Sequence, residues 1–210
     1  INLSKLDLFL PLKSFFSSDF LLKRAEVAFI KNDIKDLTKI TNIFLPKIVN
    51  KKLNKIFYKG KLEGEFIIPF EANGKIGIDY GFSGRVSDAT INLTKEFSIT
   101  NLSTEVSHAS FNKGDKFQIK IKKGSVYELD LKDSIISLIR GENKSKIESI
   151  LSTKGKLDFS QIRKISALFS LNLNKFKDIN AVLDLKTKIN FDLNKRFRIK
   201  NLSYSTIGNI

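Results

Sequence analysis

Few side chains of this chain have the types and spacing that covalent catalysis requires. His108 is the only histidine, so any histidine-dependent base or triad would have to use it. The chain has no Gly-x-Ser-x-Gly nucleophile elbow. It also has no cysteine, which excludes thiolate nucleophiles, cysteine-based metal sites and disulfide bonds. We therefore expect His108, which lies in a strand-like segment or at its end, to be structural or exposed rather than catalytic.

The carboxylates offer one acid–base pair and no metal site. Glu63 and Glu65 are two residues apart, so in a strand they would project from one face, where a general acid and base could work together. The exposed polar face of a strand explains the same spacing more simply. The other candidates form neither a calcium loop nor a nucleotide-binding glycine motif: Asp33, Asp36, Asp79, Asp88, Gly74, Gly77, Gly81 and Gly84. The sequence thus predicts a protein that is not an enzyme, with no catalytic residue, metal or cofactor.

What the chain does offer is apolar side chains at strand spacing. From Ala181 to Leu193 apolar and polar residues alternate, and Lys116–Lys122 follows the same pattern. Period-two alternation sends the two kinds of side chain to opposite faces of a strand. Ala181–Leu193 would extend about 40 Å, against roughly 17–20 Å for a common strand. Long strands with one apolar face predict an extended β-surface rather than a compact enzyme core.

The elements that would carry these side chains can be placed coarsely. Leu6, Leu8 and Leu10 predict a short strand that ends at Pro11. The region from Lys61 to about Leu131 predicts an antiparallel meander. Its turns are expected at Asn73-Gly74, Ser83-Gly84, Lys113–Asp115 and Lys123-Gly124. The parity of the apolar residues shifts at Asn101-Leu102, which indicates a bulge or a turn.

Three segments have helical spacing instead. Pro46–Phe57 predicts an amphipathic helix that ends at Gly60. Ser134–Leu151 is expected to be helical with an interruption near Gly141, and Ser160 is expected to cap a short helix that reaches Phe169. This gives four parts: a mixed segment (1–59), a first β-meander (60–131), a helical connection (132–170) and the start of a second β-repeat (171–210).

A near-repeat supports the idea of two related units. Residues 95–103 read Lys-Glu-Phe-Ser-Ile-Thr-Asn-Leu-Ser, and residues 195–203 read Lys-Arg-Phe-Arg-Ile-Lys-Asn-Leu-Ser. A chance match in a chain rich in Lys, Asn, Leu, Ile and Phe is the alternative. The predicted fold is mainly β with a few short helices: a long antiparallel meander curled into an elongated groove, in two related repeats.

The net charge of +15 raises the question of nucleic-acid binding. A single-strand binder places aromatic platforms and cations on one surface. In Lys116–Lys122, strand pleating would separate the lysines from Phe117, Ile119 and Ile121. We therefore read the lysines as the solvated face of a sheet and expect no nucleic-acid partner. A residual attraction to anionic lipid surfaces is compatible with the same charge.

One block of the chain resembles a known family. Leu45-Pro46, the basic amphipathic stretch after it, and Gly60–Phe70 look like the Leu-Pro helix and following strand of the YhdP group of AsmA-like proteins. Phe82–Ile91 and Phe97–Leu102 are similar to the next two strands of that pattern. The resemblance covers about Ile43 to Ser110, and this copy lacks the Trp residues that often accompany the pattern.

The resemblance implies a Gram-negative envelope protein of the periplasm that conducts phospholipid between the inner and outer membranes along a β-groove. Its expected partners are phospholipid acyl chains, the two membranes and envelope proteins. The chain shows no membrane span or signal peptide, so the inner-membrane anchor is expected outside it. The alternative is a scaffold, as in the related TamB proteins, that templates the β-strands of a partner; a basic nucleic-acid-binding module is a third reading.

The apolar strand residues supply the expected groove lining. The alternative for the same residues is an ordinary dry core closed by the helices. The predicted lipid-facing residues are Phe66, Ile68, Phe70, Ile76, Ile78, Tyr80, Phe82, Phe97, Ile99, Phe117, Ile119, Ile121, Leu183, Leu185, Ile189, Phe191, Leu193, Phe197 and Ile199.

Overall fold

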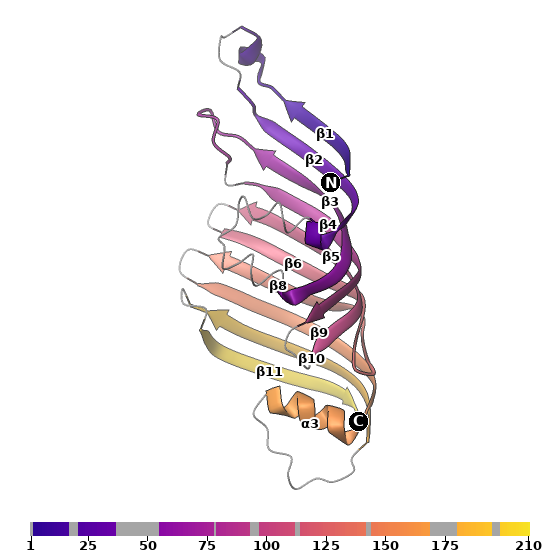
Figure 1. Ribbon diagram of the computed structural model, residues 1–210. Coiled ribbons are helices and arrows are strands. Elements are labelled where there is room, and N and C mark those ends of the chain that lie inside the picture. Colours follow the sequence, from indigo (N-terminus) through magenta and orange to yellow (C-terminus); the bar gives the residue numbers. More distant parts are fainter. Residues whose placement is uncertain are drawn as a thin grey trace.

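The fold is one antiparallel sheet of eleven strands with short helical segments beside it (Figure 1). The computed structural model describes residues 2–16, 21–36, 55–77, 79–92, 97–111, 114–141, 144–168, 180–194 and 198–210. The strands are β1 (Leu3–Phe9), β2 (Arg24–Asp33), β3 (Phe57–Pro69), β4 (Gly81–Asn92), β5 (Ser98–Phe111), β6 (Gly114–Val126), β7 (Leu129–Leu131), β8 (Ser134–Gly141), β9 (Ser145–Leu157), β10 (Ala181–Leu193) and β11 (Ile199–Asn209). A 3₁₀ helix, η1 (Leu12–Phe15), and an α-helix, α3 (Phe159–Leu168), lie outside the sheet. The predicted mainly-β class is confirmed.

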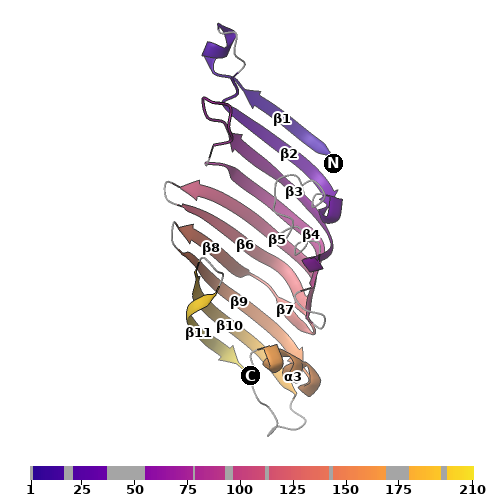
Figure 2. The same cartoon turned by 60° about the vertical axis from the view of Figure 1, so that its left-hand side comes forward.

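The strands cross the sheet in sequence order, from β1 at one edge to β11 at the other (Figures 1 and 2). The exception is β7 and β8, which each pair with β6 on one side and β9 on the other. The pair β9–β10 is as regular as the others, although α3 lies between these two strands in sequence. The described strands therefore form one continuous sheet across the predicted boundary between the two repeats.

A row of backbone irregularities bends the middle strands at one level. The pairing register shifts beside Lys59 on β3, between Val86 and Ala89 on β4, and between Thr100 and Ser103 on β5. Asp88 and Asn101 have positive φ angles of 51° and 50° at these shifts. Bulges bend a strand and increase its local twist, so bulges aligned on neighbouring strands curve the whole sheet. The bulge predicted at Asn101-Leu102 is confirmed.

The second copy of the nine-residue near-repeat has the same backbone feature. Asn201 has a φ of 53°, matching Asn101. In both copies the repeat strand has one extra residue relative to its partner strand. In the first copy, Ala89 pairs with Leu102 and Ile91 pairs with Ile99. In the second copy, Asn190 pairs with Ser203 and Asp192 pairs with Lys200. Asparagine tolerates this left-handed conformation better than most residues. In the described parts of the two copies, residues 97–103 and 198–203, the same bulge is therefore present.

The most buried part of the molecule lies on one face of the sheet beside the bulges. Its cluster of buried residues comprises Ile34, Val86, Ala89, Leu102, Ile121, Val126 and Leu131. Partly buried apolar side chains from β3, β4, β5, β6 and β8 pack against this cluster, Leu62 and Ile136 among them. No such cluster is formed by the described residues at the strand ends away from the bulges, where Ala25 is buried but most apolar side chains remain partly exposed.

Helix α3 is confirmed close to its predicted place, but its cap is one that sequence reasoning missed. The Gln161 backbone N–H donates to Asp158 Oδ1 at 2.8 Å, and the Asp158 N–H donates to Gln161 Oε1 at 3.1 Å. This reciprocal pair is a capping box with Asp158, rather than Ser160, at the N-cap.

The helix predicted over Ser134–Leu151 is wrong, because the segment forms β8 and most of β9. The isoleucines of this segment fall on both faces of the strands: Ile136 faces Ile119, whereas Ile135 faces Lys120 on the opposite face. This distribution hid the period of two, and a strand filled on both faces reads like a helix over a short window.

Other predicted boundaries also need correction. Most of the Pro46–Phe57 helix lies outside the described residues, but Phe57 begins β3 and Gly60 lies within that strand instead of ending a helix. Ser83-Gly84 and Lys123-Gly124 lie inside β4 and β6, so they are not turns. The Asn73-Gly74 turn is confirmed: Gly74 has a φ of 78°, and the Glu71 N–H donates to the Lys75 carbonyl at 2.8 Å. The strand segments expected from 171 to 179 are not described.

Two glycines let β3 and β4 approach closely in the centre of the sheet. Gly64 and Gly84 are direct cross-strand partners. A Cβ added at Gly64 would lie 2.5 Å from the Ser83 carbonyl oxygen and 2.9 Å from Gly84 Cα. The ring of Phe82 lies next to both glycines, because its atoms are 3.2 Å and 2.8 Å from the two added Cβ positions. The missing side chains therefore make room for an aromatic ring.

We expect Gly64→Ala to lower the free energy of unfolding by about 1–3 kcal/mol, the usual range for overpacking. The added methyl would clash with backbone atoms, which cannot move aside as a flexible side chain can. Gly81→Ala is the matched control, because its Cβ would meet nothing closer than 3.8 Å. Urea unfolding followed by circular dichroism measures both variants, and equal stability of the two would contradict this packing.

Candidate functional site

A continuous row of mostly apolar side chains crosses nearly the whole sheet on one face. Direct cross-strand pairing joins its members, one each from β1 to β6 and from β8 to β10. The row is Leu6, Val27, Phe66, Phe82, His108, Phe117, Leu138, Ile147 and Phe191. With neighbouring strands about 4.8 Å apart, the row is roughly 38 Å long. We call this side of the sheet the apolar face.

Aromatic rings form the centre of this row. The Phe66 ring centroid lies 5.8 Å from that of Phe29 and 4.6 Å from that of Phe82. Further along, the His108 ring lies 4.4 Å from Tyr80 and 4.2 Å from Phe117. These separations are typical of favourable aromatic pairs, each of which contributes roughly 0.5–1.5 kcal/mol beyond area burial. The ring contacts form two groups, Phe29–Phe66–Phe82 on β2 to β4 and Tyr80–His108–Phe117 around β5 and β6.

Two further rows run parallel to the first, closer to the bulges. One joins Phe29, Gly64, Gly84, Val106, Ile119, Ile136, Ser149, Ile189 and Tyr204. The other joins Leu62, Val86, Thr104, Ile121 and Ser134. Their polar members are small or neutral. The apolar face is therefore a surface several residues deep along each strand and many strands wide.

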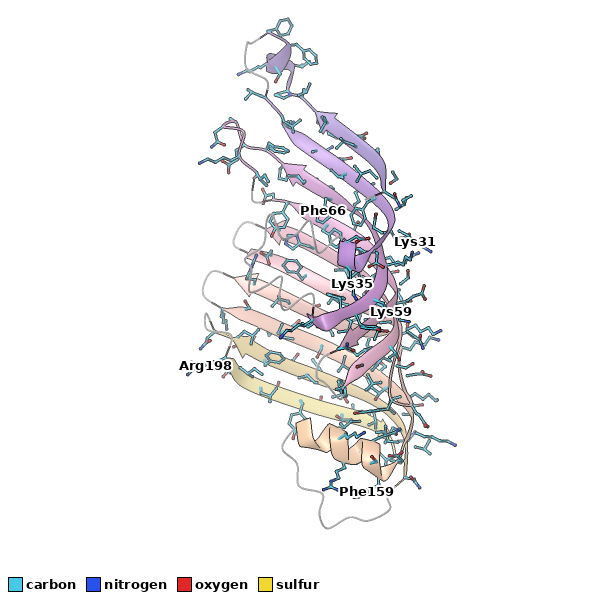
Figure 3. The ribbon with its side chains drawn as sticks, viewed as in Figure 1. Lys31, Lys35, Lys59, Phe66, Phe159 and Arg198 are labelled. Carbon is cyan, nitrogen blue, oxygen red and sulfur yellow. The ribbon has the colours of Figure 1, made fainter. Side chains whose placement is uncertain are left out.

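The opposite face carries the charge. Glu63, Arg85, Glu105 and Lys120 form a cross-strand row there, and Lys122 pairs with Glu105 at 3.2 Å. Figure 3 shows Phe66 and Lys31 pointing to different sides of the sheet. The lysines of β6 are exposed, and Phe117 lies on the other face, as predicted. We call this side the charged face.

The predicted lining residues lie mainly on the apolar face, in three groups. Phe66, Phe82, Phe117, Ile119, Ile189 and Phe191 lie in the first two rows. Ile68, Leu183, Leu185, Leu193 and Ile199 share that face through their pairing with Ala25, Gly155, Thr153, Ser145 and Leu193. Phe70 and Ile76 pair beside the Asn73-Gly74 turn, and Tyr80 stacks on His108. Ile78 and Phe197 lie outside the described residues.

A part of the predicted lining is core instead of open surface. Ile121 is only 4% exposed and belongs to the buried cluster beside the bulges, and Phe97 and Ile99 pack against that cluster. Phe66, by contrast, is 39% exposed, and Phe82, Phe117, Ile189 and Phe191 are half-buried. The dry-core alternative therefore holds for the bulge side of the apolar face, and the accessible surface lies towards the other strand ends.

Sequence reasoning missed several members of the rows. Leu138, Ile147 and Ile136 were overlooked because their segment reads as a helix, although its many isoleucines favour a strand. Val27 and Leu6 lie in shorter runs near the N-terminus. Of the two roles left open for His108, structural or exposed, the structure shows the buried one, and its place inside an aromatic row has no sequence signature.

His108 is a buried polar residue in an apolar position. It is 4% exposed, and neither ring nitrogen has a hydrogen-bond partner. Burial lowers the pKa of His108 from its usual value, and the nearby Arg140 guanidinium lowers it further, whereas Asp115 acts in the opposite direction. The imidazole is therefore held neutral near pH 7 and behaves as a further aromatic ring.

Two hollows lie on the charged face. One, of about 600 Å³, is lined mainly by Glu63, Glu65, Arg85, Glu105 and Lys120, with the Gly64 and Gly84 backbone. The other, of about 530 Å³, includes Lys146, Glu148, Lys188 and Asp192 among its lining residues. Both alternate positive and negative side chains and offer no single-sign surface for an anion or a cation.

Comparison with known proteins gives no match: no family model, no curated protein and no solved structure matches this chain. None of the helices in the described part of the chain has both the length and the apolar character to cross a membrane.

We expect His108→Phe to remove a pH-dependent loss of stability. The pKa of His108 is lower in the folded chain than in the unfolded chain, where it is about 6.5. Below that pH the imidazole is protonated in the unfolded chain but stays neutral in the folded chain, so the free energy of unfolding falls as the pH falls. The slope from one group is at most about 1.4 kcal/mol per pH unit. Phenylalanine would continue the aromatic row without titrating.

Urea unfolding between pH 7.5 and 5.5 measures the difference between the two proteins. Carboxylates such as Glu148, whose pKa is lowered from its usual value by the hydrogen bond to Lys146, stay ionised over this range and add no slope. Parallel stability curves for wild type and His108→Phe would show that the imidazole is protonated in the folded state.

Proposed function

We propose that the apolar face shelters the acyl chains of phospholipids and conducts them along the sheet between two membranes. The continuous cross-strand row from Leu6 to Phe191 is the observation that carries this proposal. It supplies an apolar path across nearly all the strands, while the other face remains charged and solvated. On this proposal the chain has no enzymatic role.

The energetics of lipid transfer explain why such a surface is useful. Each CH₂ group exposed to water costs about 0.8 kcal/mol, so a sixteen-carbon chain costs on the order of 12 kcal/mol. A half-buried row of Phe, Leu and Ile removes much of that cost at every point along the path. The row, at roughly 38 Å, is longer than one acyl layer of a bilayer, about half of the 30 Å hydrocarbon core.

Transport also requires that no point along the path binds too tightly. Along the first two rows the accessible apolar residues recur from strand to strand. Phe66, Phe117 and Phe191, on β3, β6 and β10, offer similar half-buried rings at separate points of the path. A lipid tail would therefore meet similar free energies as it passes from one strand to the next.

The same proposal places the protein in the bacterial periplasm, tethered to the inner membrane by a segment beyond this sequence. Its partners would be phospholipid acyl chains and the two membranes. The charged face fits an aqueous compartment, because its ion pairs, such as Lys154–Asp184 at 2.8 Å, are exposed. Nucleic acid is not a partner in this proposal, since the β6 lysines and Phe117 lie on opposite faces.

A second candidate is a scaffold that templates the strands of a protein partner. The observation that favours it is the pair of sheet edges: Leu3, Leu6 and Leu8 of β1 are more than half exposed, as are Leu202, Tyr204 and Ile207 of β11. Exposed edges with apolar side chains are templates for pairing with another strand. Capture of protein at β11, without lipid on the apolar face, would favour this role.

We expect a photocrosslinker at Ile189 or Phe191 to capture phospholipid acyl chains, whereas the same group at Lys188 or Asn190 does not. Neighbouring residues of β10 point to opposite faces, so the two pairs differ in face and hardly in position. Mass spectrometry of the crosslinked chain after incubation with phospholipid vesicles gives the readout. Equal lipid capture at all four positions, or at none, would sink the proposal.

A further inference from the structure

One charged pair interrupts the apolar face of the described strands. The row beyond the aromatic one joins Ser110, Asp115, Arg140, Ser145 and Leu193 by direct cross-strand pairing. Asp115 precedes Phe117 by two residues on β6, and Arg140 follows Leu138 by two residues on β8, so both lie on the face of the aromatic row. The pair lies near the strand ends away from the bulges, which makes it a rim of the apolar face.

The Arg140 guanidinium is held in place by Asp115 but keeps N–H donors that a ligand could use. Arg140 Nε donates to Asp115 Oδ2 at 2.9 Å, and Nη2 donates to the same oxygen. The Arg140 side chain is 54% exposed, whereas that of Asp115 is 11% exposed. A guanidinium has five N–H donors, and after these two bonds and one to the Tyr80 hydroxyl two of them remain. Hydrogen bonding to Asp115 raises the pKa of Arg140, and the Tyr80 hydroxyl acts in the same direction.

The buried side of the same cluster has polar atoms without partners. Asp115 Oδ1 and both ring nitrogens of His108 are buried and make no hydrogen bond. Buried polar atoms are satisfied in the great majority of native structures, so three orphans around one ion pair require an explanation. These atoms are buried, so a ligand at this rim would contact the exposed Arg140 guanidinium and feel the nearby Asp115 charge without reaching the unpaired atoms themselves.

The charges of the cluster define which ligand would fit. Arg140 contributes +1, Asp115 contributes −1 and neutral His108 contributes nothing, so the site as a whole is neutral but strongly dipolar. A bound anion would be attracted by the positive charge of Arg140 and repelled by the negative charge of Asp115. A zwitterion would gain at both ends, with a phosphate on the free guanidinium donors and an ammonium beside the carboxylate.

We infer that the Arg140–Asp115 pair binds the zwitterionic headgroup of a phospholipid, with its phosphate on Arg140 and its ammonium towards Asp115. The inference rests on the proposed function, because the tails of that lipid would lie on the apolar face. From Arg140 to the buried Ser134 is six residues along β8, about 20 Å, which accommodates one acyl layer of roughly 15 Å. The headgroup thus stays at the rim while the tail crosses the aromatic row.

The test compares three probes that share one acyl chain: a lysophosphatidylethanolamine, a lysophosphatidylglycerol and the corresponding fatty alcohol. Crosslinking from position 191 of the full 210-residue chain, as a function of probe concentration, gives an apparent affinity for each. We expect wild type to bind the phosphoethanolamine lipid about tenfold more tightly than the alcohol, as one charge-assisted contact allows. Arg140→Gln should abolish that preference.

Asp115→Asn makes the sharper prediction. It removes the negative charge that opposes an anionic lipid and leaves Arg140 positive, so the preference should shift roughly tenfold towards lysophosphatidylglycerol. Arg85→Gln, which removes an arginine from the charged face, is the matched control and should change none of the three affinities. Arg140→Lys keeps the charge, so it should retain part of the preference even if Arg140→Gln unfolds.

The outcomes separate the two levels of the proposal. All three probes could crosslink and keep the same order of affinity in Arg140→Gln, Arg140→Lys and Asp115→Asn. In that case the headgroup site is wrong, and the acyl-binding proposal stands. If none of the three probes crosslinks to wild type, the acyl-binding proposal itself fails. If Arg85→Gln changes the affinities as much as Arg140→Gln does, general charge rather than this site sets the preference.

Discussion

The register between neighbouring strands is the constraint on which the rest of the structure depends. Phe82, His108 and Phe117 meet because β4, β5 and β6 pair without a shift at that level. A slip of one residue would place Lys116 or Gln118 opposite His108 and reverse every face beyond it. The separation of an apolar face from a charged face is therefore a property of the whole set of pairings, and each strand inherits it from its neighbours.

The bulges allow the sheet to curve while the two faces stay separate. An extra residue normally moves all later side chains to the wrong face, and the sequence compensates by shifting its parity at the same point. Ile99 and Leu102 are an odd distance apart, yet both face the apolar side because Asn101 adopts a positive φ between them. Asn201 has the same positive φ at the corresponding bulge of β11. The near-repeat is thus best understood as a backbone bulge that occurs twice within one continuous sheet.

Much of the fold could be predicted from the sequence wherever one face was polar. The alternation in 181–193 and 116–122 identified β10 and β6 and the correct faces of Phe117, Ile189 and Phe191. The prediction failed at β8, where apolar residues occupy both faces and the period disappears. It also failed to separate accessible lining from core: Ile121 and Ile119 lie two residues apart on one face, and only their neighbours across the sheet make the first buried and the second half-exposed.

The Arg140–Asp115 pair could not be predicted from the sequence, because the two residues lie on different strands. Its possible role depends on the face of the sheet that the two side chains share. An ion pair on a solvated face contributes little and needs no function. On an apolar face the same pair carries a desolvation cost that well-packed apolar residues would avoid, especially with Asp115 Oδ1 left without a partner. Even apolar rows let a lipid tail move, but they cannot tell one end of a lipid from the other. A single dipolar pair at the rim would supply that direction, because it favours the orientation in which the headgroup lies at the strand ends and the tail lies across the rings.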